Sequence, residues 1–332
     1  MENPETTLQI ATAGEALIDL IGRPDGLFEP CLGGSVFNFT RAMARQDVGT
    51  LYLNPLSGDR FGRRLAQALA ADGVRLARPD PVPQATSLAV VGLTEAGHPD
   101  YAFYRQGVAD RAVTASGLVR ACEAAPTLRM VCSGCLALAP DDAGIYLPWL
   151  AASRDAGKTV VVDANLRPSV MPDLGAYRRH VLAALALADI VKASDEDLDH
   201  LGIAGDGALD KARNLLALTG ARWMALTLGG EGACLLTRGG QHWQAREAAP
   251  VRVVDTVGAG DCFLAGLLTA VLLEGEPVRE TLGDAPAGQI LSHALASASL
   301  CVMQRGCVPP TRAAVLARMR DFPCLLSAQG GD

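Results

Sequence analysis

The sequence predicts an α/β protein in which helices cover both faces of a mainly parallel central sheet, giving three layers (α/β/α). Three observations lead to this fold class. Short β-rich runs alternate with longer helix-like stretches, glycines follow several of these stretches directly before a strand, and two early segments break the alternation. We expect residues 1–332 to form a single domain, with segments 16–32 and 85–108 as a small, discontinuous β lid.

The expected strands are short and rich in aliphatic and β-branched residues. They are Ile10–Ala13, Leu51–Leu53, Met130–Cys132, Thr159–Val162, Ile190–Lys192, Trp223–Leu228 and Ala233–Thr237. Helix-like stretches lie between many of them, at Val36–Gln46, Phe61–Asp72, Ile145–Ala156, Ala176–Ala188 and Ala208–Thr219. Three of these helices are followed by a glycine that directly precedes a strand, namely Gly73, Gly157 and Gly220, and this is the usual place for a left-handed helix cap.

The two segments that break the alternation are expected to be hairpins. Each alternates polar and apolar residues around a turn signal, at residues 23–26 in the first and 95–98 in the second. Two hairpins of this kind can join into one small sheet above the main layer. At the other end of the chain, we expect residues 327–332 to be frayed.

Composition excludes several classes of protein. The net charge of −7 argues against a nucleic-acid partner, which needs a concentrated basic face. No run approaches the roughly 18 apolar residues of a membrane span, and the polar N-terminus lacks a signal-peptide pattern. Nine scattered cysteines suit a reducing compartment, so we expect a soluble, cytoplasmic protein. Cys132 and Cys135 lie in the apolar run 128–138, and we interpret them as buried structural thiols.

The segment Val251–Leu268 carries the strongest chemical signal. A strand-like run is expected to end at Val254, followed by the small residues Gly258-Ala259-Gly260 and a helix from about Asp261 to Leu273. Unpaired N–H groups and the helix dipole at such a start can bind an anion. The Asp261 carboxylate beside that anion site can take the proton of an attacking hydroxyl while a phosphoryl group is transferred. The alternative is an ordinary helix-capping aspartate.

Five ordered motifs resemble the PfkB carbohydrate kinases, the family with the ribokinase-like fold. The resemblance runs from about Ile10 to Gly306. The motifs are Gly33-Gly34-Ser35-Val36-Phe37-Asn38, Asp163-Ala164-Asn165-Leu166-Arg167-Pro168, Lys192-Ala193-Ser194-Asp195-Glu196-Asp197, Thr227-Leu228-Gly229-Gly230-Glu231-Gly232, and Asp255-Thr256-Val257-Gly258-Ala259-Gly260-Asp261.

The resemblance implies a role for each matching residue. Asp261 is implied as the base that activates a sugar hydroxyl, with Gly258, Ala259 and Gly260 as the anion hole. The residues implied to bind the sugar are Asp19, Gly33, Gly34, Asn38, Arg105, Asn165 and Arg167. Those implied on the nucleotide side are Lys192, Ser194, Thr227, Gly229 and Gly232.

ATP and Mg²⁺ are the cofactors that the resemblance implies. Many relatives carry N-x-x-E as their Mg²⁺ motif, whereas this chain has Ser194 and Asp197 at those places. Asp197 keeps a carboxylate that can reach the metal through water, but its shorter side chain leaves open which carboxylate orders the ion. Some members also bind K⁺, which the resemblance would place at Asp255 and Val257, near Gly306.

Residues 101–105 and the motif at 163–168 resemble the fructokinase branch, so D-fructose is the expected sugar and fructose 6-phosphate the product. Arg105 would bind sugar oxygens, or a carboxylate if the substrate is 2-keto-3-deoxygluconate. Nucleosides are disfavoured because aromatic residues are only 5% of the chain. A non-catalytic sugar or nucleotide sensor on the same fold is a further alternative. The resemblance also implies that two copies can pair through the lid strands, as they do in many members of the family, whereas other members are monomers.

Overall fold

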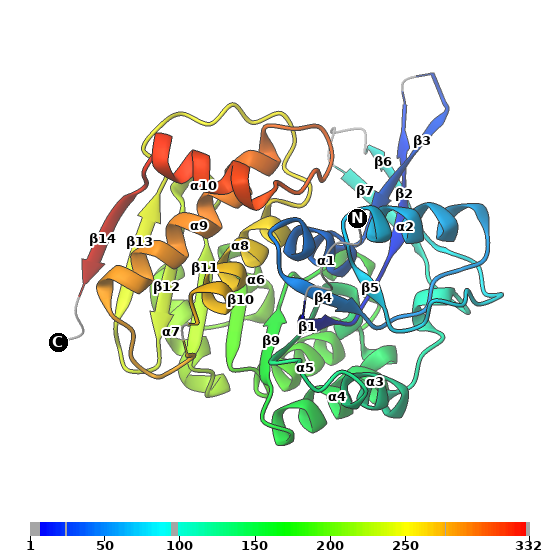
Figure 1. Cartoon of the computed structure of the whole chain (residues 1–332), viewed down its shortest axis with the longest axis horizontal. Helices are drawn as coiled ribbons and strands as arrows, with labels where there is room; N and C mark the ends of the chain where they lie inside the picture. Colours follow the sequence, from blue (N-terminus) through cyan, green and yellow to red (C-terminus); the bar gives the residue numbers. More distant parts are fainter. Residues whose placement is uncertain (1–6, 24, 94–98, 276, 330–332) are drawn as a thin grey trace.

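A computed structural model describes residues 7–23, 25–93, 99–275 and 277–329 of the chain. A large sheet crosses the molecule, with strand order β14-β13-β12-β11-β10-β9-β8-β1-β4-β5 (Figure 1). From β11 to β5 all neighbouring strands are parallel, whereas β12, β13 and β14 continue the sheet in antiparallel pairs. This arrangement confirms the predicted fold class.

The strands of the large sheet are β1 (Leu8–Thr12), β4 (Gly49–Tyr52), β5 (Arg75–Leu76), β8 (Met130–Gly134), β9 (Thr159–Asp163), β10 (Ile190–Ser194), β11 (Trp223–Thr227), β12 (Ala233–Thr237), β13 (His242–Arg246) and β14 (Leu325–Gln329). The α-helices are α1 (Ser35–Arg45), α2 (Arg60–Ala71), α3 (Ala115–Glu123), α4 (Ala143–Asp155), α5 (Leu174–Leu185), α6 (Asp195–Leu201), α7 (Ala208–Thr219), α8 (Ala259–Glu274), α9 (Asp284–Val302) and α10 (Arg312–Asp321).

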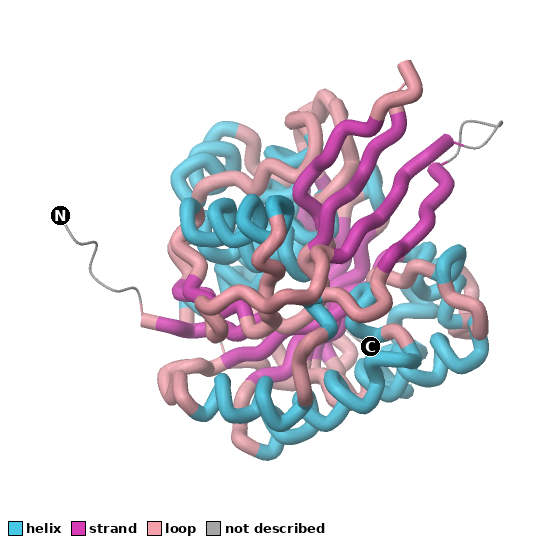
Figure 2. The backbone as a smooth tube through the Cα atoms, turned by 90° about the vertical axis from the view of Figure 1, so that its right-hand side faces the viewer, coloured by secondary structure: helices cyan, strands magenta, loops and turns pink. Residues whose placement is uncertain are grey.

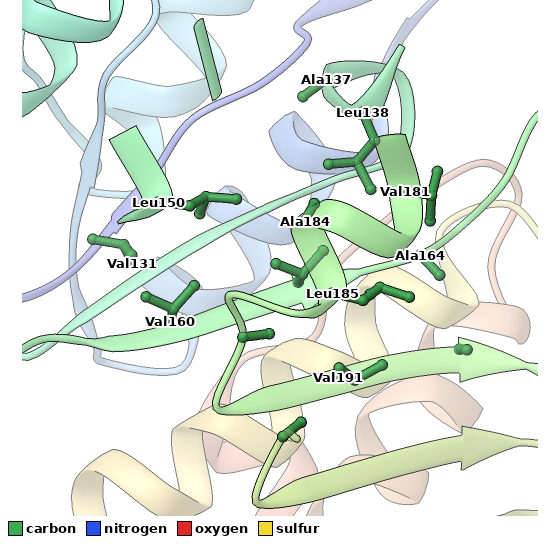
Figure 3. Packing of buried hydrophobic residues seen from close by; sticks show 14 of the residues in the cluster. Val131, Ala137, Leu138, Leu150, Val160, Ala164, Val181, Ala184, Leu185 and Val191 are labelled. Carbon is green, nitrogen blue, oxygen red and sulfur yellow. The ribbon is translucent and has the colours of Figure 1, made fainter. Parts of the chain in front are cut away.

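The core lies on both faces of this sheet because alternate strand residues point in opposite directions. In β9, Val160 and Val162 join the cluster under α4 and α5, whereas Val161 joins the cluster under α8 and α9. Figure 3 shows part of the first cluster, with Leu150 on α4 and Leu185 on α5 among its side chains. The three-layer order therefore follows from the apolar character of consecutive residues in the central strands.

Four strands form a second sheet that stands off the main body (Figure 2). Its order is β3-β2-β6-β7, where β2 (Leu17–Gly22) and β3 (Phe28–Gly33) form one hairpin and β6 (Ser87–Leu93) and β7 (Pro99–Tyr104) form the other. The two hairpins join through the parallel pair β2–β6. The predicted small sheet is thus confirmed, although its second turn signal, at 95–98, lies outside the described residues.

Several local predictions are confirmed. Gly73, Gly157 and Gly220 all have left-handed backbone conformations. Cys132 and Cys135 are buried and unpaired. The run 128–138 is a strand only as far as Gly134, because Cys135 turns away with a φ of 53° and opens a short 3₁₀ helix.

Two predictions were wrong. Residues 251–254 are a loop and not a strand, because the N–H groups of Val254 and Asp255 both donate to Val302 O at the end of α9. Residues 327–329, the described part of the end predicted to be frayed, are instead ordered, because they belong to β14, which pairs in antiparallel register with β13 at the edge of the large sheet; residues 330–332 lie outside the described residues. Within the described residues, no helix is both long and apolar enough to cross a membrane.

Candidate active site

The site lies where the parallel strands β1, β9, β10 and β11 reach their carboxyl ends. Asp163 ends β9, Ser194 ends β10 and Thr227 ends β11, and the last two are register partners. The loop after β1 leads to Gly14 and Glu15 at the same edge. Ligands of open parallel sheets bind at this edge, because the loops that follow the strands meet there.

Asp261 lies in the first turn of α8, and its side chain is bound by α1. The Ser35 hydroxyl donates to Asp261 Oδ1 at 2.6 Å, and the Asn38 amide donates to Oδ2 at 3.1 Å. Asp261 is only 6% exposed. The carboxylate is therefore held in one orientation, with both oxygens bound.

A chain of side-chain hydrogen bonds continues from Ser35 into the loop after β9. Asn165 Nδ2 donates to Ser35 Oγ at 2.8 Å, and Arg167 Nη1 donates to Asn165 Oδ1 at 2.8 Å. Asn165 has a φ of 35°, a conformation that is strained for a residue with a side chain. The structure thus brings two predicted sugar-binding residues into the hydrogen-bond network of Asp261.

The N-terminus of α8 is open to an anion. Gly258 precedes the helix with a φ of 79°, and among the described residues no side chain caps this end. The Ala259 N–H donates to Thr256 O at 3.2 Å, whereas the next N–H groups, of Gly260 and Asp261, lie in the turn where a helix has no carbonyl to offer them. Of the predicted anion-hole residues, Gly260 therefore has an N–H group that is more available to an anion than that of Ala259. The N–H group of Asp261 is available in the same way.

Two cationic side chains, Lys192 and Arg167, act on the charge of Asp261. Lys192 Nζ lies 3.0 Å from the Asp163 carboxylate and 2.9 Å from the place a Cβ on Gly260 would take. Burial raises the pKa of Asp261 above its usual value, while the Ser35 hydrogen bond and the Lys192 charge act in the opposite direction. Burial also raises the pKa of Asp163, to about 7, against the effect of Lys192.

Asp19 and the two predicted glycines form one side of the site. A Cβ on Gly33 would lie 2.0 Å from Asp19 Oδ2, so only glycine leaves room for this carboxylate. Gly34 has a φ of 101°, and a Cβ there would lie 2.7 Å from Glu15 O. Burial raises the pKa of Asp19 to about 6, against the charge of nearby Arg167. Arg167 is therefore close enough to act on the pKa of both Asp19 and Asp261.

Arg105 lies in a second charged cluster behind the lid. Its guanidinium is buried, with Nη2 3.7 Å from carboxylate oxygens of both Asp110 and Asp142, and Nη1 donates to Leu136 O at 3.2 Å. Its Nε is buried without a hydrogen-bond partner. Arg105 thus lies neither on the lid surface nor in contact with Asp261, and its charge is met by protein carboxylates.

The predicted Mg²⁺ residues form a capping box. Ser194 Oγ accepts from Asp197 N at 3.1 Å, and Asp197 Oδ2 accepts from Ser194 N at 2.8 Å. Asp197 Oδ1 accepts from Leu166 N at 2.7 Å, which ties α6 to the loop of Asn165. Each Asp197 oxygen retains a second lone pair, so the carboxylate can still accept from a metal-bound water.

The remaining nucleotide-side residues lie beyond Ser194. Thr227 ends β11, and Gly229 and Gly232 flank a short 3₁₀ turn with φ values of 55° and 100°. A Cβ on Gly232 would lie 2.1 Å from Ala245 O, so this glycine is required by the neighbouring β13. Within the described parts of the chain, the hydrogen bonds of Asp261 go to Ser35 and Asn38 and not to these residues.

The loop before α8 is tied to the end of α9 by Asp255. Its Oδ1 accepts from Val257 N at 3.0 Å, and its Oδ2 accepts from Gly306 N at 2.8 Å. Asp255, Val257 and Gly306, the residues that the resemblance implied for K⁺, are therefore joined by hydrogen bonds, and their role in binding an ion stays a prediction.

Three polar residues of the site were missed at the sequence level. Ser35 binds Asp261 directly, Glu15 Oε1 accepts from Ser35 N at 2.9 Å, and Asp163 pairs with Lys192. The sequence signal that could have identified two of them is their position at the end of an element. Ser35 starts a helix directly after Gly33-Gly34, and Asp163 ends a strand. Their partners are at least 20 residues away in the chain, so no local pattern reveals them.

Comparison with known proteins agrees with this geometry. Residues 7–314 match the pfkB family of carbohydrate kinases. The chain belongs to this family. This carbohydrate kinase is 33% identical to a fructokinase of Rhizobium leguminosarum bv. trifolii over 269 residues, which are 80% of each chain. It is also 30% identical to a fructokinase of Escherichia coli, over 79% of this chain and 84% of that protein.

Solved structures extend the likeness to the fold. A fructokinase double mutant of Vibrio cholerae O395, with fructose, ADP and a potassium ion bound, aligns with a TM-score of 0.78 and 25% identity, covering 95% of this carbohydrate kinase and 99% of that chain. The ribokinase-like fold and the fructokinase-like branch, both expected from the motifs, are confirmed.

Proposed function

We propose that this carbohydrate kinase transfers the γ-phosphoryl group of ATP to the 6-hydroxyl of D-fructose. The observation that carries the proposal is the position of Asp261, whose carboxylate is held by α1 beside the open N-terminus of α8. A base and an anion site within one helical turn are what phosphoryl transfer to a hydroxyl needs.

Asp261 acts as the general base. Its carboxylate takes the proton of the sugar hydroxyl as that oxygen attacks phosphorus, and Ser35 and Asn38 keep it oriented. The N–H groups that begin α8 stabilise the transferring phosphoryl oxygens, together with the charge of Lys192. Asp19, Asn165 and Arg167 then bind the other sugar hydroxyls, with Gly33 and Gly34 giving the backbone close approach.

A neutral sugar fits the charges better than a sugar acid. Arg105 already faces the carboxylates of Asp110 and Asp142, and Glu15 is near enough to influence its pKa. A substrate carboxylate would have to compete with these buried groups. The fructokinases among the relatives and the fructose-bound neighbour support the same choice.

The cations are assigned to the loops that follow the strands. Mg²⁺ would arrive with ATP and be held through water by Asp197, near Asp163, whose carboxylate is paired with Lys192 at 3.0 Å. The ion neutralises phosphate charge when bound. K⁺ would lie at the loop of Asp255 and Val257, which the potassium-bound neighbour supports.

We extend the proposal to the domain, its assembly and its compartment. The chain acts as one domain in which the small sheet is a lid over the sugar, and two copies pair through this lid. Exposed apolar residues on β3 and its turn support the pairing, since Leu27 is 61% and Phe28 52% exposed.

Nine free cysteines support a reducing compartment such as the cytoplasm.

The test is a substrate panel. Purified protein with Mg²⁺–ATP is assayed against fructose, 2-keto-3-deoxygluconate, ribose, tagatose and adenosine, and the phosphorylated carbon is identified by NMR. We expect fructose to give the highest kcat/KM and a 6-phosphate product. Higher kcat/KM with 2-keto-3-deoxygluconate would overturn the sugar assignment and make Arg105 a carboxylate ligand. No turnover with any sugar would favour a sensor.

A further inference from the structure

Three cysteine side chains meet behind the anion site. Cys262 follows Asp261 on α8, Cys301 lies near the end of α9, and Cys307 lies in the loop after it. Their sulfur atoms all lie within 4.8 Å of one another. The helices α8 and α9 pack along each other (Figure 1), so Cys262 and Cys301 are held on two adjacent helices, and Cys307 lies in the loop that follows α9.

The spacing suits a metal ion bound by three thiolates. Metal–sulfur bonds of about 2.3 Å in tetrahedral geometry put sulfurs about 3.8 Å apart, so these sulfurs need to close by at most about 1 Å. Thiolate ligands select soft cations such as Cu⁺ and Zn²⁺ over Mg²⁺ or K⁺. Cys262 and Cys301 are buried, and Cys307 is the partly exposed member of the three.

The cluster also touches the groups that bind phosphate. A Cβ on Gly258 would lie 2.2 Å from Cys307 Sγ, so this sulfur packs directly against the residue that starts α8. The Cys301 thiol donates to Val257 O at 3.5 Å. A metal that draws the three sulfurs together would therefore pull on Gly258 and on Asp261, the neighbour of Cys262.

We propose that Cys262, Cys301 and Cys307 form a site for one soft, thiophilic metal cation, and that loading this site inhibits phosphoryl transfer. Binding converts three thiols to three thiolates on the metal and releases three protons. No electron transfer is involved. Inhibition follows because transfer depends on sub-ångström placement of Asp261 and of the N–H groups that begin α8.

The binding test uses Cd²⁺ as the probe, under a non-thiol reductant and without ATP or sugar. The thiolate-to-cadmium absorbance band reports binding. We expect one Cd²⁺ per chain, with affinity reduced at least about tenfold in Cys307→Ala and in Cys301→Ala, since even loss of an outer-shell partner costs about 10–100-fold. Cys324→Ala, which removes a partly exposed cysteine outside the cluster, is the matched control and should bind normally.

A second measurement on the unmodified protein guards against variants that fail to fold. Alkylation of Cys307, followed by mass spectrometry, should slow at least about tenfold when one equivalent of Cd²⁺ is present.

Turnover of the unmodified protein should fall on Cd²⁺ loading and recover when a chelator is added. Turnover of Cys307→Ala, compared with the metal-free rate of the same variant, should resist Cd²⁺. Unchanged alkylation of Cys307, or equal Cd²⁺ affinity in all variants, would overturn the site. Binding without inhibition would overturn only the coupling to Asp261.

Discussion

The Ser35 hydroxyl donates a 2.6 Å hydrogen bond to Oδ1 of Asp261, which joins the first turns of α1 and α8 across 226 residues of sequence. This bond sets both the orientation and the basicity of the carboxylate. It makes Ser35 a positioning residue whose removal has a specific signature.

Ser35→Ala should shift the pH dependence of turnover. Burial raises the pKa of Asp261 and the Ser35 hydrogen bond counteracts this, so its loss raises the pKa further. Asp261 is a base only when ionised, so the acid limb of the kcat–pH profile moves to higher pH. The profile is measured beside Ser116→Ala, an exposed serine on α3. An acid limb at the wild-type position would contradict the role given to Ser35.

Gly33→Ala should weaken sugar binding selectively. The new Cβ would lie 2.0 Å from Asp19 Oδ2 and displace that carboxylate. We expect KM for fructose to rise at least about tenfold, as for a lost charge-assisted hydrogen bond, with KM for ATP little changed. Gly92→Ala, on β6 of the same small sheet, meets no atom within 4 Å and is the matched control. Equal increases in the KM for fructose and the KM for ATP would contradict the assignment of Asp19 to sugar binding.

Glu15→Gln should stabilise the protein at alkaline pH. Burial raises the pKa of Glu15 from 4.5 to about 7, against the charge of Arg105. The folded state therefore binds more protons than the unfolded state between these values, and stability falls as pH rises through this window. Glutamine keeps an oxygen for Ser35 N and carries no charge, which adds roughly 3 kcal/mol at pH 8 at most.

Urea denaturation of wild type and Glu15→Gln at several pH values measures this effect. The gap in the free energy of unfolding should shrink steadily as pH falls from 7 towards 4.5. A gap that is independent of pH would mean that burial does not raise the pKa of Glu15 in the folded protein.

Phe28→Asp should dissociate the proposed dimer. Phe28 is 52% exposed on β3, an edge strand of the small sheet, where a second copy can pair. Light scattering after gel filtration should give a monomer mass for Phe28→Asp and a dimer mass for wild type. Leu218→Asp, at a 64% exposed leucine of α7, is the control and should remain dimeric. A monomeric wild type would refute the assembly.

The sequence predicted the fold well because its signals are local. Apolar strands such as 159–162 and glycine stops such as Gly220 depend only on neighbouring residues. Residues 251–254 were misassigned because β-rich composition cannot tell that their N–H groups find Val302 O. The same limit applies to the site. Asp261 could be predicted from its motif, but its bond to Ser35 and the meeting of Cys262 with Cys301 and Cys307 are products of tertiary packing.

The central claim is that Asp261 is the base in ATP-dependent phosphorylation of fructose, and the most direct measurement compares Asp261→Asn with wild type. Asparagine preserves the shape of the side chain and removes the proton acceptor. We predict that kcat with fructose falls by about 10²–10⁴-fold, the usual contribution of a positioned general base, while the Kd for fructose from calorimetry changes little. A kcat within tenfold of wild type would contradict the account.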